Sequence, residues 1–301
     1  MQRRLNNKFM KKVIISVIIS IFVVFIIDIS LYTFDINNLN KLFKKFNAPQ
    51  YKWSYSIFAK HQYLNGVLNS DFRKPIHIKS KKSPIVIFGC SYAYGAHLES
   101  DENFGANLAK LTNRPVYNFG ISGYSVQHFL ALLENKDFSD IKNPEYVIYV
   151  YMYDHMRRMY SKFYNNCDKN SYFRYLYKNN DLVIDENKSP SLYIFRKLHC
   201  FLINFITRNP QYKQENMKIF SKYIEKANII IKEKFPNSKF IIYVYEDDMN
   251  YDWELIEKMG IKIIKNPDLD KVRSMKLLDG HPSAEAWKYF TPIFIKEAGI
   301  N

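Results

Sequence analysis

The sequence predicts an α/β domain in which an open, mostly parallel five-stranded sheet carries helices on both faces. Two observations support this fold class. Short apolar runs without polar alternation recur along the chain, which is the pattern of strands buried on both faces of a parallel sheet. Between them lie longer segments whose apolar residues fall at helical spacing, and strand–helix alternation of this kind is typical of a layered α/β sheet.

Five runs have strand character: 84–89 (PIVIFG), 115–120 (PVYNFG), 145–153 (EYVIYVYMY), 239–246 (KFIIYVYE) and 261–265 (IKIIK). The predicted helices are 101–112, 125–136, about 213–234, 252–260 and 283–298. Asp101 and Ser125 suit the N-caps of the first two helices, because short polar side chains accept hydrogen bonds from a helix's first N–H groups. In the first helix, Phe104, Leu108 and Leu111 fall at helical spacing.

The alternation is interrupted between residues 160 and 210, which we interpret as an insertion into a globular domain spanning 83–301. The insertion contains a predicted hairpin that turns at Asn179–Asn180, followed by an aromatic helix at 191–206. We expect this insertion to frame a substrate groove.

The N-terminus predicts a single-pass membrane anchor. Residues 1–12 hold five cations and no acid, and the apolar segment 13–34 has the length of about 20 helical residues that a bilayer requires. No small-x-small cleavage signal follows it, which favours a retained anchor over a signal peptide. The positive-inside rule then places the N-terminus in the cytoplasm and the body outside the inner membrane. The alternative is a buried core helix.

Residues 35–82 are rich in Asn, Lys and aromatics and are interpreted as a stalk. The net charge of +15 is spread along the chain, which indicates a solvated basic surface or one attracted to anionic lipid or glycan. We find no nucleic-acid-binding motif. Cys167 and Cys200 either form a disulfide or remain free thiols, and no Cys/His spacing resembles a metal site, so neither metal nor cofactor is expected.

Side chains and turns that could take part in catalysis follow several predicted strands. They are Ser91, the turn NFGISGYS (118–125), the pair Asp154–His155, and the motif LDGHPS (278–283). Ligands of open parallel sheets bind beyond the carboxyl ends of the strands, and all four groups fall there. We therefore expect them to converge on one edge of the sheet.

This set of groups has the parts of a serine nucleophile site. A serine hydroxyl needs an adjacent base, for which His281 is suited, and Asp279 two residues earlier reaches the ring Nδ1 if the chain is extended. The backbone N–H groups of Ser91 and Gly123 are suited to hold an oxyanion. The plain alternative is that Ser91 is an ordinary turn residue.

Over residues 83–156 and 275–298 the chain resembles the SGNH (GDSL-type) hydrolases. FGCSYAYG resembles their first block, NFGISGYS the second and DGHPSAEAW the last. The resemblance implies a three-layer flavodoxin-like fold. It also implies that Ser91 is the nucleophile, Gly123 the oxyanion glycine, His281 the base and Asp279 its partner.

Three positions depart from the family pattern. Cys90 replaces the usual aspartate before the serine, and the Asp-x-x-His spacing is shortened to Asp-x-His. Asp154 stands where an asparagine normally donates to the oxyanion, so either Asp154 is protonated or another donor such as His155 replaces it. Alternatively, Asp154 and His155 form a structural pair with Arg157 or Arg158. We interpret His97 and His128 as helix-surface or rim residues.

The expected function is that of an extracytoplasmic serine esterase or O-acyltransferase acting on an acylated cell-envelope glycan or a small ester. Related anchored domains cooperate with membrane acyl carriers, so such a partner is expected with transfer. The rival function is a catalytically silent glycan-binding or scaffolding subunit of a membrane complex, for which Asp154 is the reason. A third alternative makes Cys90 the nucleophile.

Overall fold

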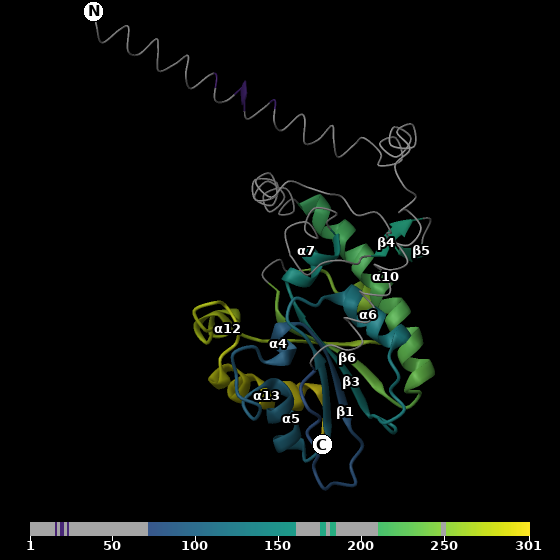
Figure 1. Ribbon diagram of the computed structural model, residues 1–301, viewed down its shortest axis with the longest axis vertical. Coiled ribbons are helices and arrows are strands. Elements are labelled where there is room, and N and C mark those ends of the chain that lie inside the picture. Colours follow the sequence, from purple (N-terminus) through teal and green to yellow (C-terminus); the bar gives the residue numbers. More distant parts are fainter. Residues whose placement is uncertain are drawn as a thin grey trace, which may run out of the picture.

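The computed structural model describes residues 72–160, 175–178, 181–184, 210–247 and 251–301, together with the separate residues 16, 19, 20 and 23. Its central sheet has the order β2-β1-β3-β6-β7, and all four neighbouring pairs are parallel (Figure 1). The strands are β1 (Ile85–Gly89), β2 (Val116–Gly120), β3 (Tyr146–Met152), β6 (Lys239–Glu246) and β7 (Lys262–Lys265). Counted along the chain this is the order 2-1-3-4-5 of flavodoxin-like folds, so the predicted α/β fold class is confirmed.

Both faces of the sheet are covered by helices, because each central strand is apolar on both sides. In β1, Val86 and Phe88 pack into one core with α6 and α10, whereas Ile85 and Ile87 pack into the other with α5 and α13. The bounds are α5 (Phe104–Thr112), α6 (Val126–Asn135), α10 (Pro210–Lys234), α11 (Glu254–Glu257), α12 (Leu269–Ser274) and α13 (Ala284–Ala298). The result is a three-layer α/β/α domain.

Short helices lie at the carboxyl ends of the strands. α4 (Ser91–Tyr94) follows β1 directly, and α7 (Asp154–Tyr160) follows β3. Figure 1 shows both at the end of the sheet opposite the C-terminus. These two helices, and α12 before the last helix, are too short to produce an apolar period, and the sequence pattern does not predict them.

The predicted hairpin is present, and one predicted cap is wrong. β4 (Tyr175–Lys178) and β5 (Asp181–Ile184) pair antiparallel, with Lys178 opposite Asp181, while the predicted turn at 179–180 lies outside the described residues. The helix expected from Asp101 begins at Phe104 instead, because Asn103 Oδ1 accepts from Ala106 N at 3.0 Å. Leu111 on that helix points to solvent.

Several predicted features lie outside the described residues: the aromatic helix at 191–206, both cysteines of the possible Cys167–Cys200 disulfide, and most of the anchor at 13–34. Among the residues that are described, no helix is both long enough and apolar enough to cross a bilayer.

The described end of the predicted stalk packs on the body. Ile76 pairs antiparallel with Val116 at the start of edge strand β2, through backbone hydrogen bonds of 2.9 and 3.1 Å. Phe72 lies edge-on against Phe119 with ring centroids 5.2 Å apart. Residues 72–82 therefore form an extension of the domain along β2.

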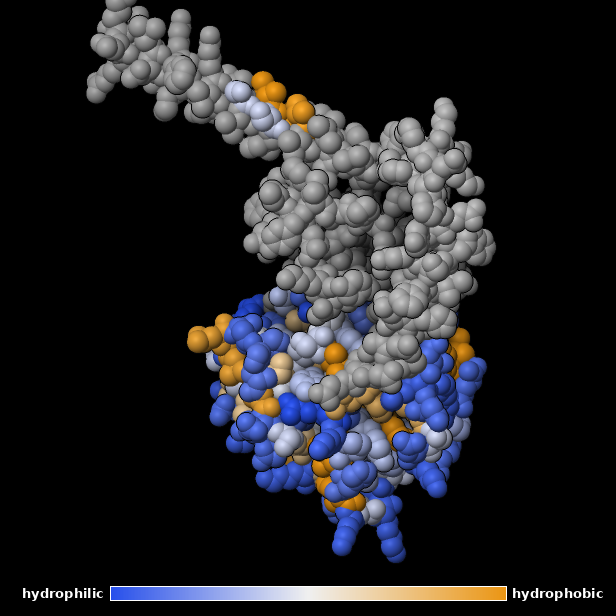
Figure 2. Space-filling model, in the orientation of Figure 1, coloured by the Kyte–Doolittle hydropathy of each residue, from blue (hydrophilic) through white to orange (hydrophobic). Residues whose placement is uncertain are grey.

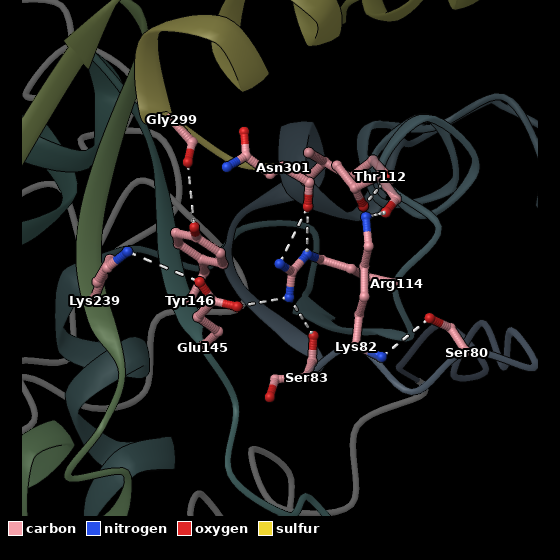
Figure 3. Close-up of polar contacts among 11 residues, drawn as sticks. Ser80, Lys82, Ser83, Thr112, Arg114, Glu145, Tyr146, Lys239, Gly299 and Asn301 are labelled. Carbon is pink, nitrogen blue, oxygen red and sulfur yellow. Dashed lines mark hydrogen bonds and ion pairs between the residues drawn. The ribbon is translucent and has the colours of Figure 1, made fainter.

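The amino ends of the strands are closed by a network around Arg114 (Figure 3). The Arg114 guanidinium is almost fully buried and pairs with Glu145 Oε2 at 2.8 Å. It also donates to Ser83 O at 3.0 Å and to Asn301 O at 3.1 and 3.2 Å. One side chain thus ties the starts of β1, β2 and β3 to the end of the chain.

Much of the described surface is polar. Figure 2 shows a largely hydrophilic face with scattered apolar areas, one of them at the left, where Figure 1 places α12. Beyond the N-terminal segment, the exposed large apolar residues are Leu111, Ile229, Leu255, Leu278 and Tyr289. Leu278 is fully exposed and directly precedes Asp279.

Candidate active site

The Ser91 position is created by the end of β1. The strand ends at Gly89, Cys90 precedes the helix, and Ser91 is the first residue of α4, where it is 4% exposed. α4 lies so close to β2 that a Cβ on Gly120 would be 2.5 Å from Tyr94 N. Only glycine at position 120 permits this approach, which keeps Ser91 directly on the carboxyl edge of the sheet.

Asn118 fixes the relative position of α4 and the predicted oxyanion turn. Its Nδ2 donates to Ala93 O at 2.6 Å, while its Oδ1 accepts from Gly120 N at 2.9 Å. The chain then turns through residues 121–124, closed by Tyr124 N donating to Ile121 O at 3.1 Å, with Gly123 at φ 83°. A positive φ at this third turn position favours glycine. Gly123 therefore lies on the same edge as Ser91.

Asp279 and His281 form a hydrogen-bonded pair in the loop between α12 and α13. Asp279 Oδ2 lies 2.8 Å from His281 Nδ1, and Oδ1 accepts from His281 N at 3.1 Å. The predicted pairing is therefore present, but the extended conformation assumed for it is wrong. Gly280 has a φ of 90°, and the chain makes an Asx-type turn, in which the Asp279 carboxylate accepts from the backbone N–H two residues later.

The protonation of this pair follows from the same contacts. Hydrogen bonds from the His281 backbone and side chain lower the pKa of Asp279, so the carboxylate is an acceptor at neutral pH. His281 therefore donates through Nδ1, and in the neutral imidazole the acceptor lone pair then lies on Nε2. An imidazole in this tautomer can accept a proton from a nucleophile.

The His281 loop is attached directly to the Ser91 helix. The Tyr92 hydroxyl donates to Gly280 O at 2.9 Å, with Glu246 Oε2 3.3 Å from the same hydroxyl, and the Tyr92 and His281 rings lie 5.7 Å apart. Burial and the neighbouring Glu246 raise the pKa of Tyr92, so its hydroxyl remains a donor. These contacts bring the loop that carries Asp279 and His281 to the carboxyl edge, against Tyr92, the residue that follows Ser91.

A buried ion pair anchors this loop to the sheet. Glu246 ends β6 and is 1% exposed, and its carboxylate pairs with Lys276 at the start of the loop. Lys276 also bridges Pro282 across the loop, and Ser283 N donates to Met275 O at 3.0 Å. His281 is therefore carried on a small, closed loop.

Asp154, at the place of the family asparagine, faces a cation. Arg158 Nη2 lies 3.5 Å from Asp154 Oδ2, and Arg158 Nη1 donates to Tyr124 O at 2.9 Å. Asp154 therefore forms the pair with Arg158 that was one of the predicted alternatives. The guanidinium offsets the carboxylate charge and ties α7 to the turn that carries Gly123.

His155 has a different surrounding from Asp154. Its ring is fully buried, with Nδ1 2.7 Å from the Tyr149 hydroxyl and the Tyr151 ring edge-on at 5.6 Å. Burial, together with the Arg158 charge, lowers the pKa of His155 well below its ordinary value. His155 is therefore a neutral histidine packed on the core tyrosines. Its role as an oxyanion donor stays a prediction.

Cys90 is buried completely beside the nucleophile position. Burial raises the pKa of its thiol, against an opposing effect of the Arg158 charge. A nucleophilic cysteine needs the opposite, a lowered pKa and access to substrate. The structure therefore argues against Cys90 as the nucleophile.

Three parts of the site are not predicted by the sequence. Glu246 and Lys276 belong to none of the motifs, and His97 is predicted only as a rim residue. His97 does lie at the rim, with Nε2 2.8 Å from Asp279 Oδ2, but its contact depends on turn geometry and leaves no sequence signal. The prediction that His128 is a helix-surface or rim residue is wrong. It is 5% exposed in α6, and its Nδ1 accepts from Ser125 N at 3.2 Å.

The ligand atoms of His97, Asp279 and His281 all lie within 4.8 Å of one another, which makes them the group of described residues that could hold a metal ion.

Comparison with protein-family models finds no match, and comparison with curated proteins finds none either. Among solved structures, the chain is similar to a lipolytic protein of the G-D-S-L family from Desulfitobacterium hafniense, at 13% identity and a TM-score of 0.42, covering 72% of this chain and 99% of that one. It is also similar to an acetyl xylan esterase from Butyrivibrio proteoclasticus, at 12% identity and a TM-score of 0.45, covering 74% and 66%.

An acetylxylan esterase from Geobacillus stearothermophilus is a further similar structure, at 14% identity and a TM-score of 0.41, covering 75% of this chain and 98% of that one. All three likenesses are distant, so the chemistry assigned to this chain depends on the geometry of its own site.

Proposed function

We propose that this chain is a serine esterase of SGNH type, with Ser91 as nucleophile, His281 as base and Asp279 as the residue that orients His281. One observation carries the proposal. The Asp279–His281 pair, with its contact of 2.8 Å, is held by Gly280 O against Tyr92, the residue that directly follows Ser91. A serine, an imidazole and a carboxylate in this arrangement are the parts of a nucleophilic acyl-transfer site.

The chemistry is set by these groups. Ser91 Oγ attacks the ester carbonyl while His281 Nε2 takes the hydroxyl proton, and Asp279 stabilises the imidazolium that forms. Collapse of the tetrahedral intermediate breaks the bond to the alcohol, which leaves with the proton from Nε2. Water, or the hydroxyl of an acceptor, then gives its proton to Nε2 and attacks the acyl-enzyme, and Ser91 recovers its proton from His281.

The oxyanion of both intermediates would be held by the N–H groups of Ser91 and Gly123. Donors of this kind are effective because they are fixed before the charge develops. Asp154 would repel the oxyanion if it carried an uncompensated charge. Its pairing with Arg158 at 3.5 Å offsets that charge, and this supports a working site in spite of the substitution.

We further propose that the domain acts outside the inner membrane, held by the predicted anchor at 13–34, on ester groups of a cell-envelope glycan or a similar polymer. The cationic N-terminus and the net charge of +15 support this location and an anionic or polymeric substrate. Delivery of acyl groups by a membrane carrier would make the reaction a transfer to a glycan hydroxyl instead of a hydrolysis.

The decisive test is hydrolysis of p-nitrophenyl acetate by the full-length protein. Wild type should release nitrophenol, and Ser91→Ala should lower kcat by at least about 10³-fold, because removing one triad member removes covalent catalysis. Ser122→Ala is the matched control, since Ser122 lies exposed in the neighbouring turn, and it should retain activity. Equal rates for wild type and Ser91→Ala would refute the proposed function.

Asp154 motivates one alternative: a catalytically silent domain that binds glycan or scaffolds a membrane complex. Loss of one oxyanion donor raises an activation barrier by about 3 kcal/mol. Under this alternative the folded wild type would hydrolyse no ester, and Asp154→Asn would create activity. Under the proposed function, wild type is active before that substitution.

A further inference from the structure

Asp279 holds two imidazoles, not one. Its Oδ2 lies 2.8 Å from His281 Nδ1 and 2.8 Å from His97 Nε2, and its Oδ1 accepts from His281 N at 3.1 Å. A catalytic carboxylate needs to orient only its own histidine. The second imidazole comes from the segment that carries the nucleophile, six residues after Ser91, and not from the loop of the base.

His97 is held in an unfavourable backbone conformation. Its φ is 65°, in the left-handed region that residues other than glycine seldom occupy. Arg73 fixes the turn by donating to three carbonyls, Tyr94 O at 3.0 Å, Gly95 O at 2.7 Å and Leu98 O at 2.8 Å. Backbone strain of this kind persists where surrounding contacts impose it, and it often marks functional positions.

Asp279 requires such support because of its surroundings. Its side chain is 44% exposed, and it follows the fully exposed Leu278 in a loop. A carboxylate open to solvent can exchange its partners for water and rotate away from His281. A second imidazole against the same oxygen, from a different segment of the chain, restricts that rotation.

We propose that His97 is a positioning residue that holds Asp279 in the orientation in which Asp279 aligns His281 with Ser91. This inference rests on the proposed function and extends it. His97 acts through Asp279 Oδ2, and its ring lies beside that of His281, with centroids 5.3 Å apart. The segment 91–97 would then supply both the nucleophile and the support of its base.

A bound metal is the competing explanation for this cluster, and the distances favour a hydrogen bond to His281 and a direct ion-pair contact with His97. Charge-assisted N–H···O⁻ bonds measure about 2.7–2.9 Å, which matches the hydrogen bond from His281, and His97 Nε2 approaches Asp279 Oδ2 to the same 2.8 Å. Ligands bound to zinc at about 2.0–2.2 Å in tetrahedral geometry lie about 3.3 Å from one another. The distances from Asp279 Oδ2 to His97 Nε2 and to His281 Nδ1, both 2.8 Å, are shorter than that.

The test compares His97→Ala and His97→Gln in the full-length protein, with His77→Ala as the control for loss of an exposed histidine far from Asp279. With p-nitrophenyl acetate, His97→Ala should lower kcat by about 10- to 100-fold at a nearly constant KM, because the base is misaligned and the substrate contacts remain. His97→Gln retains an N–H donor at a similar reach and should restore most of kcat.

A second readout does not depend on turnover. In the Ser91→Ala background, the His281 Nδ1 proton should give a downfield proton NMR signal that is present in His97→Gln and lost or broadened in His97→Ala. A His97→Ala protein with wild-type kcat and an unchanged signal would overturn the inference. Equal losses in His97→Ala and His97→Gln would also overturn it, as would activity removed by EDTA and restored by Zn²⁺.

Failure of the proposed function looks different from failure of this inference. If Ser91→Ala retains the activity of the wild type, the serine mechanism itself is wrong. If Ser91→Ala is inactive while His97→Ala equals the wild type in kcat and in its NMR signal, only the positioning role is wrong.

Discussion

The two ends of the sheet are both rich in charged hydrogen bonds, yet they do different things. At the amino end, the donors of Arg114 go to backbone carbonyls and to Glu145 (Figure 3). At the carboxyl end, Asp279 and His281 bond to each other and leave Nε2 of the imidazole open. A guanidinium cannot give up its proton, whereas an imidazole can take one and return it.

Burial separates the two ends as clearly as chemistry does. Arg114 is 6% exposed, and its contacts join the chain end to three strand starts, so the network serves folding. Asp279 is 44% exposed in a loop, so its contacts add little to stability and can serve orientation instead. The density of polar contacts therefore does not identify a site; a proton that can move, in a place that a substrate can reach, does.

The largest expected effect is on activity at the carboxyl end. Asp279→Asn keeps the shape of the side chain but removes the charge that fixes the His281 tautomer, so kcat should fall by about 10³–10⁴-fold. The urea midpoint should hardly move, because the residue is exposed. Steady-state kinetics and urea unfolding of the same preparations measure both. A loss of less than tenfold in kcat would contradict the assigned role.

The next largest effect is on stability at the amino end. Arg114→Met should lower the free energy of unfolding by about 3 kcal/mol, the low end for breaking a buried ion pair, because Glu145 keeps contact with water. Lys239→Met removes the exposed partner of the same carboxylate, 3.8 Å away, and should change little. The kcat of the folded Arg114→Met protein should equal that of wild type. A large fall in kcat would show that the amino end of the sheet also affects catalysis.

The smallest effect is a slope in stability with pH. Burial, with the Arg158 charge, lowers the pKa of His128 to about 3, so the folded protein leaves it neutral while the unfolded chain protonates it below about 6.5. The unfolded state then binds more protons, and stability falls as pH drops from 6.5 towards 3. Each such histidine contributes up to about 1.4 kcal/mol per pH unit.

The substitution that isolates this effect is His128→Gln, which retains an acceptor for Ser125 N. Its unfolding free energy should fall less steeply between pH 6.5 and 5 than that of wild type. Urea unfolding at several pH values measures the slopes. Identical slopes for wild type and His128→Gln would show that His128 titrates normally in the folded protein.

The fold is predictable from the sequence because the strands are buried on both faces. All five residues of β1 are buried, which produces the unbroken apolar run that predicts it. Helix ends are harder to predict: Asp101 and Asn103 are both good caps, and only the structure shows Asn103 bonded to Ala106 N. His128 is buried although the pattern predicts a surface or rim residue, because local periodicity does not show that the Tyr124 ring stacks on it, with centroids 4.5 Å apart.

The candidate site divides in the same way. Ser91, Gly123, Asp279 and His281 could be proposed from motifs because their spacing is set by strand ends and a short loop. His97 and Glu246 could not, because each meets its partner only through tertiary contact. Asp154 is recognisable in the sequence as a departure, but its pairing with Arg158 on the next turn of α7 is only one of several alternatives there.

The most direct measurement is labelling of the full-length protein with a fluorophosphonate, followed by mass spectrometry of its peptides. An activated serine should carry the phosphonyl adduct at Ser91, and the adduct should disappear in Ser91→Ala and in His281→Ala. A folded wild-type protein that gains no adduct, or gains it on another residue, would contradict a catalytic centre built from Ser91, His281 and Asp279.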